Sequence, residues 1–376
     1  MAGPYVECLD VLGAAAHADA WRALCGRALE ANAFAEPGFL IAAARHIAPP
    51  GLEFVLVWES AERRRLLGVL ALAPPRLGVA AVWRSKEAGL AALALDRDGA
   101  AAAFEAAALW LSKMRPSVAG LQVPTLAAHG PTAALIEGFA GRRSLTFIAH
   151  NPRQRAVLYA ARDGQKRLDA ALPGKRLKEW RRLRRRFGER GGLVFRSAQG
   201  AEAAQAADAF LALEPRNWKG RAGAPLNAEP GRAAFARSAL AALAAEGKLR
   251  IDSLECAGAP AAMGLILLSQ DRAFYWKTAY DEAFAEFSPG VLLTLDISRK
   301  QQDDPRIAAT DSCAIEGHPM IERLWPQRLE LVDCLVALRP GGAWRLKLWL
   351  AERALARHAK DAAKRLLFPL LGRKRS

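Results

Sequence analysis

The chain has 376 residues, of which 52% are hydrophobic and 24% charged, enough to bury a core in two domains of ordinary size. Its formal net charge is +16 and its isoelectric point is near 10.1, so we expect an anionic partner: a nucleic acid, a membrane surface or a phosphorylated substrate. Five scattered cysteines without a C-x-x-C pair argue against a disulfide framework or a metal site. The sequence also lacks a long uncharged apolar run and a signal-like start. We therefore expect a cytoplasmic protein without a membrane-spanning helix.

The first 160 residues mix helical and strand patterns and contain no glycine-rich phosphate loop. Trp21, Leu24 and Cys25 lie on one face of a predicted helix, and an alanine-rich helix is predicted to end before Pro116. We predict helices over 18–31, 100–114 and up to 139, and strands over 54–58, 66–72, 118–123, 145–148 and 156–159.

The second part of the chain begins with helical segments, and the pattern changes to strands after Gly247. A basic helix is predicted over about 165–190, and three strands separated by short turns should form an antiparallel meander before one more helix and strand. The predicted helices are 165–190, 201–213, 232–245 and 289–300, and the predicted strands are 193–196, 248–256, 261–268, 272–280 and 307–315.

The helix after the meander opens at Ser288-Pro289-Gly290. The first amides of a helix have no intrahelical acceptor and lie at the positive end of its dipole, so they can bind an anion. We predict a phosphate-binding site here, with the backbone amides of Ser288, Gly290, Val291, Leu292 and Leu293 as candidates. The alternative is an ordinary start with Ser288 as N-cap and proline at the first position.

This order of elements resembles the acyl-CoA-binding half of the GCN5-related N-acetyltransferase (GNAT) fold, in which two strands splay around the thioester arm and a helix N-terminus binds the pyrophosphate. Four segments also resemble the BioF2-like, or CelD-like, acetyltransferase group, which is related to Fem-type aminoacyltransferases. The segments are 32–40 (NAFAEPGFL), 210–226 (FLALEPRNWKGRAGAPL), 274–293 (FYWKTAYDEAFAEFSPGVLL) and 311–325 (DSCAIEGHPMIERLW). The loop before the helix has fewer glycines than in ordinary members.

The resemblance implies an α/β (α+β) fold of two tandem acetyltransferase-type mixed sheets flanked by helices, followed by a basic C-terminal tail. We expect a degenerate N-terminal half over residues 1–160, an acyl-CoA-binding half over 161–342, and the tail over 343–376. The implied co-substrate is acetyl-CoA or another acyl-CoA, without a metal ion.

Transfer from a thioester to an amine requires a proton acceptor and a group that protonates the leaving thiolate. Asp311, on the last predicted strand, is a candidate base or ammonium partner, and the alternative is a carboxylate that caps a turn. His318 has a suitable ordinary pKa but could equally be a loop residue with one hydrogen bond. Tyr280 could protonate the thiolate or simply contribute packing.

Charged and aromatic residues near Glu214 suggest an acceptor site. Trp218 offers an apolar wall, and Lys219 and Arg221 could hold an anionic group, although the segment could also be a loop whose tryptophan fills the core. Lys277 is flanked by aromatic residues, so it should pair with an acid such as Asp311 or reach the cleft.

Two basic segments could recruit further partners. Residues 175–186 carry eight basic residues against one acid, and residues 345–376 carry ten against two. The apolar positions of the first segment recur at helical spacing, so that face should be packed and the arginines should surround it. The tail could contact an anionic membrane surface, placing the protein on the inner face of a membrane, or could dock on the protein itself.

These observations favour an acyl-CoA-dependent N-acyltransferase. An amino group of a polar acceptor, such as an amino sugar or a cell-envelope or polysaccharide precursor, would attack the thioester directly, because no cysteine has an activating partner in the sequence. Two alternatives stay open: a Fem-like transferase that uses aminoacyl-tRNA, and a non-catalytic accessory protein of polysaccharide biosynthesis. No sequence-specific DNA binding is expected.

Overall fold

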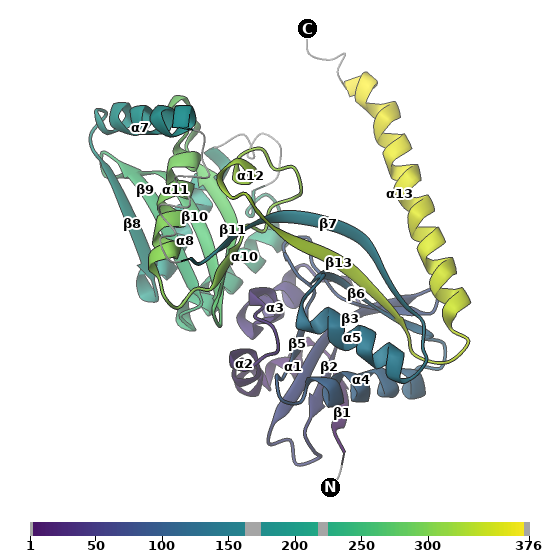
Figure 1. Ribbon diagram of the computed structural model, residues 1–376. Helices are drawn as coiled ribbons and strands as arrows, with labels where there is room; N and C mark the ends of the chain where they lie inside the picture. Colours follow the sequence, from purple (N-terminus) through teal and green to yellow (C-terminus); the bar gives the residue numbers. More distant parts are fainter. Residues whose placement is uncertain (1–2, 162–173, 217–224, 372–376) are drawn as a thin grey trace.

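The computed structural model describes residues 3–161, 174–216 and 225–371, and it shows helices packed on both faces of one extended sheet (Figure 1). The first half contains five α-helices and seven strands among the described residues. The strands are β1 (Tyr5–Leu9), β2 (Glu53–Trp58), β3 (Leu66–Arg76), β4 (Val79–Val82), β5 (Leu93–Leu95), β6 (Gly120–Ala127) and β7 (Phe147–Tyr159). The helices are α1 (Val11–Ala15), α2 (Ala18–Gly26), α3 (Pro37–His46), α4 (Ala100–Met114) and α5 (Pro131–Arg142), with a 3-10 turn η1 (Ala33–Ala35).

The second half holds the expected meander, helix and strand. Its strands are β8 (Leu193–Gln199), β9 (Leu249–Cys256), β10 (Ala259–Ser269), β11 (Arg272–Tyr280), β12 (Ala309–Asp311) and β13 (Gln327–Ala337). Its helices are α7 (Gly174–Gly188), α8 (Ala201–Leu213), α10 (Pro230–Ala245), α11 (Pro289–Asp303), α12 (Ile321–Leu324) and α13 (Ala343–Leu371), with 3-10 turns η2 (Glu214–Arg216) and η3 (Glu282–Phe287). The mixed α/β class with helices on the sheet is confirmed.

The two expected sheets are joined into one mixed sheet of 13 strands, in the order β1-β2-β3-β4-β6-β13-β7-β12-β11-β10-β9-β8 with β5 beside β3. The joint is made by β13, which pairs with β6 on one side and β7 on the other, and by β7, which also pairs with β12. The last strand of the chain therefore lies between two strands of the first half, and the halves share a continuous backbone hydrogen-bond ladder.

Strand β7 is longer than its sequence suggests. The sequence predicts two short strands here because the intervening residues 149–155 are mostly polar, but both ends belong to one strand. Its pairing with β13 shifts between Leu331 and Asp333, so Asn151 and Pro152 lie at an irregularity of the ladder. A proline there removes no ladder hydrogen bond, and the strand continues through it.

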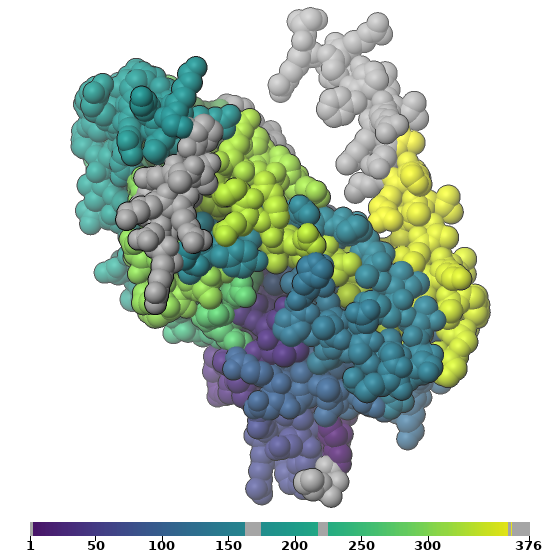
Figure 2. All heavy atoms as spheres, in the orientation of Figure 1, coloured from purple at the N-terminus to yellow at the C-terminus, as the bar shows by residue number. Residues whose placement is uncertain are grey.

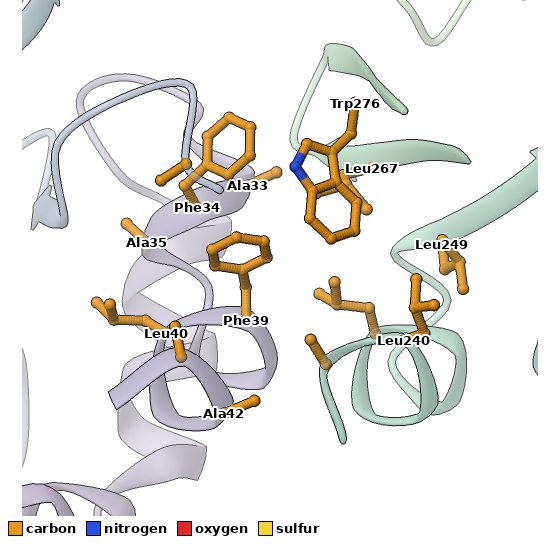
Figure 3. Packing of buried hydrophobic residues seen from close by; sticks show 14 of the residues in the cluster. Ala33, Phe34, Ala35, Phe39, Leu40, Ala42, Leu240, Leu249, Leu267 and Trp276 are labelled. Carbon is orange, nitrogen blue, oxygen red and sulfur yellow. The ribbon is translucent and has the colours of Figure 1, made fainter. Parts of the chain in front are cut away.

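Aromatic residues from both halves form a shared core (Figure 3). Phe39 of α3 has edge-to-face contacts with Phe34, Phe235 and Trp276, at ring-centroid distances of 5.2, 5.2 and 5.5 Å. Phe34 and Phe39 belong to the first half, whereas Phe235 and Trp276 come from α10 and β11. Each half contributes an apolar surface made of these rings, and the surface is buried because the other half covers it.

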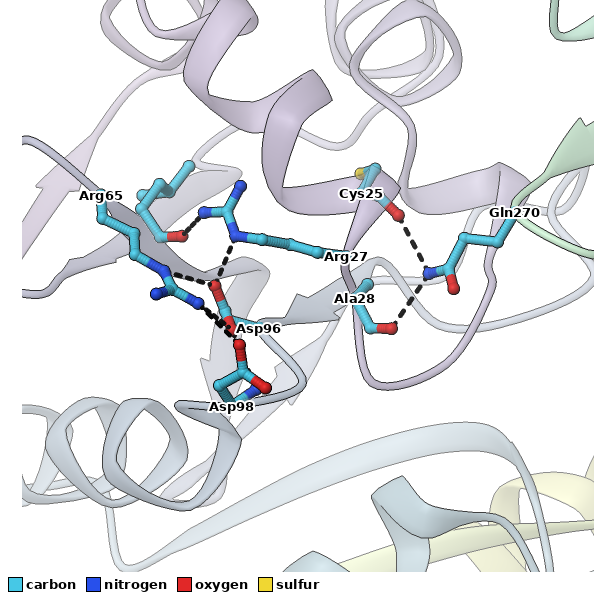
Figure 4. A network of polar contacts seen from close by, with 8 residues as sticks. Cys25, Arg27, Ala28, Arg65, Asp96, Asp98 and Gln270 are labelled. Carbon is cyan, nitrogen blue, oxygen red and sulfur yellow. Dashed lines mark hydrogen bonds and ion pairs between the residues drawn. The ribbon is translucent and has the colours of Figure 1, made fainter.

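A polar seam near the α2 end also connects the halves (Figure 4). Gln270, in the turn between β10 and β11, donates from Nε2 to the carbonyl oxygens of Cys25 and Ala28 at 3.0 Å each. Beside it, the fully buried Asp96 accepts hydrogen bonds from Arg27 at 2.6 Å and Arg65 at 2.9 Å. Burial alone would raise the pKa of Asp96, but the two arginines outweigh it and the pKa is lowered.

The basic helix α7 packs through one apolar stripe, as its spacing predicted. Leu183 and Phe187 are buried, and the Phe187 ring stacks on Phe287 with centroids 4.7 Å apart and an interplanar angle of 5°. Arg184 of the same helix pairs with Asp296 of α11 at 2.7 Å. Helix α7 is thereby fixed beside η3 and β8, and the Arg184–Asp296 pair ties it to the middle of α11.

The C-terminal helix α13 docks by its first turns and then extends beyond the body of the protein, in yellow in Figure 2. Leu346 and Trp349 are buried against β4 and β13. On the opposite side of the helix, Trp344, Leu348 and Leu355 are 61%, 50% and 70% exposed. None of the described helices is long and apolar enough to span a lipid bilayer.

Candidate active site

Strands β11 and β12 run parallel and then separate. They pair only from Arg272 opposite Ala309 to Phe274 opposite Asp311. The sequence predicts a strand as far as residue 315, but the strand ends at Asp311, because its carboxylate accepts the Cys313 amide at 2.8 Å and Cys313 has a φ of 53°. Such a local side-chain-to-backbone bond turns the chain out of the ladder. Among the described residues, no strand pairs with the remaining length of β11 on that side.

A cavity of about 900 Å³ opens at this separation. Trp276 and Lys277 of β11 and Cys313 and Ala314 after β12 form one end. The first half provides the long wall, from β4, β6, β7 and the loop of residues 83–89, and helix α13 provides the far side. The cavity thus connects the separated strands with surfaces of both halves and is large enough for a sizeable ligand.

The start of α11 differs from the expected open N-terminus. Ser288 has a left-handed backbone (φ 52°, ψ 52°) and its side chain does not cap the helix. The amides of Val291 and Leu292 donate to the Ser288 carbonyl at 3.0 and 3.2 Å, and the side chains of Leu292 and Leu293 are buried in the core. Among the described residues, the Gly290 amide has no acceptor.

Gly290 and Tyr280 lie together at this helix start. A Cβ atom built on Gly290 would meet Tyr280 Cδ1 at 3.7 Å and Met320 Sδ at 3.9 Å, both ordinary contacts. Arg186 and Arg190 lie nearby, 5.9 and 5.7 Å from the centroid of the Phe287 ring, and Glu286 pairs with them at 3.9 and 3.4 Å, so two positive charges face one negative charge here. The sequence interpretation did not assign these two arginines to the phosphate site: Arg186 is the last residue of the basic segment 175–186, and Arg190 lies four residues beyond it.

Asp311 is held in an ion pair rather than directed at open solvent. Its carboxylate pairs with Arg155 of β7, and the two side chains are 8% and 5% exposed. Arg155 also donates to the Gly89 carbonyl oxygen at 3.0 Å. Arg155 lines the 900 Å³ cavity, whereas Asp311 lines a second cavity of about 840 Å³, so the pair lies between the two.

Lys277 pairs with an acid, as expected, but the acid is Glu87 of the first half rather than Asp311. The Lys277 Nζ to Glu87 Oε2 distance is 2.7 Å, and Arg232 of α10 lies 2.8 Å from Oε1. The Trp276 indole also donates to the Glu87 carbonyl oxygen at 2.7 Å. Burial would raise the pKa of Glu87, but the charges of Lys277 and Arg232 outweigh it and the pKa is lowered.

The other predicted site residues have local structural partners. His318 is half-buried and its Nδ1 accepts from the Ile321 amide at 3.5 Å at the start of α12. Glu214 is buried and accepts from the Leu226 amide at 2.6 Å. Trp218, Lys219 and Arg221 lie outside the described residues. The structure therefore brings Lys277 to the cavity and Tyr280 to the helix start, whereas His318 and Glu214 line neither large cavity.

Cys313 is the cysteine that lines the 900 Å³ cavity. Burial raises the pKa of its thiol well above the ordinary value, and the neighbouring Asp311 carboxylate raises it further. A thiol with a raised pKa is a poor nucleophile at neutral pH. This chemistry favours direct attack of an acceptor over a covalent enzyme intermediate.

His150 of β7 should make the stability of the protein depend on pH. Its ring meets Trp349 of α13 edge-on at 6.2 Å, and burial lowers its pKa; Asp333 opposes this, and the charges of Arg357, Arg153 and Arg353 lower it further. The folded protein then binds fewer protons than the unfolded chain near the ordinary pKa of 6.5, so stability should rise with pH through that region. Urea unfolding at pH 5 and pH 7.5 should show a smaller rise in His150→Phe, and an unchanged rise would contradict this assignment.

Comparison with known proteins gives a family for the second half. Residues 174–308 match the acetyltransferase (GNAT) domain family. The sequence matches none of the curated proteins at a meaningful level.

Several solved structures share the fold over most of the chain. FemX has a TM-score of 0.56 at 10% identity, covering 84% of this chain and 95% of its own. The C-terminal domain (DUF2156) of a proposed lysylphosphatidylglycerol synthetase from Agrobacterium fabrum has a TM-score of 0.54 at 10% identity, with coverages of 90% and 96%. A conserved protein of unknown function from Bacteroides thetaiotaomicron has 0.51 at 11%, with 86% and 97%. At these identities the likeness shows the fold.

Proposed function

Residues 174–308 match the GNAT acetyltransferase domain family, and from that premise we propose that this chain transfers an acyl group from acyl-CoA to an amino group of a polar acceptor. The observation that carries the proposal is the separation of β11 and β12 beyond Phe274 and Asp311, which opens onto the 900 Å³ cavity. An amino sugar or another cell-envelope or polysaccharide precursor is the acceptor class that we propose.

In this proposal, the thioester arm of acyl-CoA lies between the separated strands β11 and β12, and its pyrophosphate lies near the start of α11. The Gly290 amide, together with Arg186 and Arg190, supports this placement, because a free amide at a helix N-terminus and two arginines together favour an anion. With Val291 and Leu292 amides bound to Ser288, the arginines would contribute more of the phosphate binding than in a glycine-rich loop.

In the proposed reaction the acceptor nitrogen attacks the thioester carbonyl carbon, the carbon–nitrogen bond forms and the carbon–sulfur bond breaks. The proton lost by the amine passes to Asp311, which adjoins Cys313 of the cavity wall, and Tyr280 protonates the departing CoA thiolate. His318, which lines neither large cavity, is the alternative proton acceptor. The high pKa of the Cys313 thiol supports this single transfer without an acyl-enzyme.

Acyl-CoA binding is tested by thermal unfolding with acetyl-CoA, longer acyl-CoAs and free CoA. A ligand at about 100 times its dissociation constant stabilises the folded state by about 2.7 kcal/mol, so the melting temperature of the wild type should rise by a few degrees. In Gly290→Glu the added carboxylate should repel the pyrophosphate and remove the rise.

Gly141→Glu is the matched control, because Gly141 lies on α5 and a Cβ there meets nothing within 4 Å. It should keep the full rise, and Gly290→Ala should fold normally. If no CoA raises the melting temperature of the wild type, the acyl-CoA proposal is wrong.

A second candidate uses aminoacyl-tRNA as donor. The fold likeness to FemX and the basic helix α7 support it, since exposed arginines attract a nucleic acid backbone. Binding of aminoacyl-tRNA without any effect of CoA would favour this candidate. An accessory role in polysaccharide biosynthesis would be favoured if neither donor bound while the protein associated with anionic vesicles.

A further inference from the structure

The 900 Å³ cavity has a large excess of positive charge. Among the described residues, eight arginine and lysine side chains line it against three carboxylates. Two of these carboxylates are already neutralised: Glu87 by Lys277 and Arg232, and Asp333 by Arg153 at 2.9 Å. The third, Glu316, is exposed. The cavity therefore offers cations that the protein itself does not balance.

Three arginines carry most of this unbalanced charge. Arg84, Arg353 and Arg357 line the cavity, and no described carboxylate forms an ion pair with any of them. Arg84 donates to the Ala88 carbonyl oxygen at 2.9 Å, and Arg353 lies 4.9 Å from the centroid of the Trp349 ring. The guanidinium groups of Arg84 and Arg353 are thus oriented by neutral partners and keep donors for a ligand.

The pKa of Arg84 also reflects the positive charge around the cavity. Burial lowers the pKa of Arg84 first, and the charges of Arg153 and Arg155 lower it further despite the opposing charge of Asp333. Positive charges that repel one another inside a partly enclosed space are stabilised when an anion binds between them.

We propose that Arg84, Arg353 and Arg357 bind a phosphate group of the acceptor in this cavity. A guanidinium group can donate two parallel hydrogen bonds to the oxygens of a phosphate or a carboxylate. Three guanidinium groups match the several oxygens of a phosphate better than the two oxygens of one carboxylate. The inference rests on the proposed function, because the same cavity reaches Trp276, Lys277 and Cys313 at the separated strands. The acceptor would be held by its phosphate at the α13 side while its amine reaches the thioester.

A phosphate-bearing amine could come from a soluble precursor or from a phospholipid headgroup. Helix α13 makes the lipid source testable, because Trp344, Leu348 and Leu355 form an exposed apolar stripe on the side of the helix away from Arg353 and Arg357. A helix with such a stripe and flanking basic residues can lie on an anionic membrane surface. The arginines would then face a cavity next to that surface.

The test compares Arg353→Gln/Arg357→Gln with Arg64→Gln/Arg142→Gln in the full chain. The control pair removes the same charge from two exposed arginines that do not line the cavity. Phosphoethanolamine and ethanolamine are titrated calorimetrically, and sedimentation is measured with phosphatidylcholine vesicles that contain or lack phosphatidylethanolamine, whose headgroup carries both a phosphate and a primary amine. For a soluble source, phosphoethanolamine should bind the wild type and the control pair with similar affinity. It should bind Arg353→Gln/Arg357→Gln, the cavity pair, at least tenfold more weakly.

For a lipid source, only vesicles with phosphatidylethanolamine should sediment the protein, and both the cavity pair and Trp344→Ser/Leu348→Ser should lose this binding. The inference is overturned if neither probe binds, or if the cavity and control pairs bind equally. The acetyl-CoA melting shift is measured on the same proteins. A melting shift with acetyl-CoA but no binding of either phosphate probe refutes only the proposed acceptor class. Binding of a phosphate probe without the melting shift refutes only the acyl-CoA donor.

Discussion

Replacing Asp311 by asparagine is expected to lower the free energy of unfolding by about 3–5 kcal/mol, because the change leaves Arg155 as a buried charge without its partner. Both side chains are less than a tenth exposed, so water cannot replace the lost carboxylate. Urea unfolding of the wild type and the variant at pH 7.5 measures the loss.

The double variant Asp311→Asn/Arg155→Met separates a structural role from a catalytic one. With both charges removed, a large part of the lost stability should return. If Asp311 is only structural, acyl transfer should return with it, whereas a base would leave the double variant folded and inactive. A single variant as stable as the wild type would show that the pair is not formed in solution.

Replacing Phe39 by alanine is expected to cost about 3–5 kcal/mol of stability, since the fully buried ring contacts three other aromatic rings and its removal leaves a cavity. Because the ring lies between the halves, a single unfolding transition should move to lower urea concentration rather than divide into two. Intrinsic tryptophan fluorescence reports the transition through Trp276.

Leu109→Ala provides the comparison, because Leu109 is 41% exposed on α4 and its truncation should change stability by less than about 1 kcal/mol. Two separate transitions in Phe39→Ala would mean that the halves are held together by the sheet alone and not by this core.

The sequence predicted best those elements whose signals are local. The helices over 100–114 and 201–213 and the three meander strands are present with bounds close to those expected, because alanine-rich or alternating segments end at glycine, proline or a short turn. The packed face of α7 follows from its spacing as well. The long-range order of elements was enough to indicate the GNAT fold.

Features that depend on distant pairing could not be predicted in this way. Strand β13 was not predicted, because nothing in residues 327–337 indicates that strands more than 150 residues earlier will accept it on both sides. For the same reason, the sequence did not indicate Glu87 or Arg155 as site residues. Glu87 pairs with Lys277 and Arg155 pairs with Asp311, and only folding brings these partners together. The catalytic assignments of Asp311, His318 and Tyr280 stay predictions.

The insertion of β13 between β6 and β7 has a consequence for synthesis on the ribosome. Until residue 337 has emerged, the facing edges of β6 and β7 lack the strand that pairs with them, although β6 ends at residue 127 and β7 at residue 159. Unpaired strand edges invite association with other chains. The nascent protein must therefore keep a gap in its sheet open and protected while residues 160–337 are made, and a chain that terminates before residue 327 would keep that gap permanently.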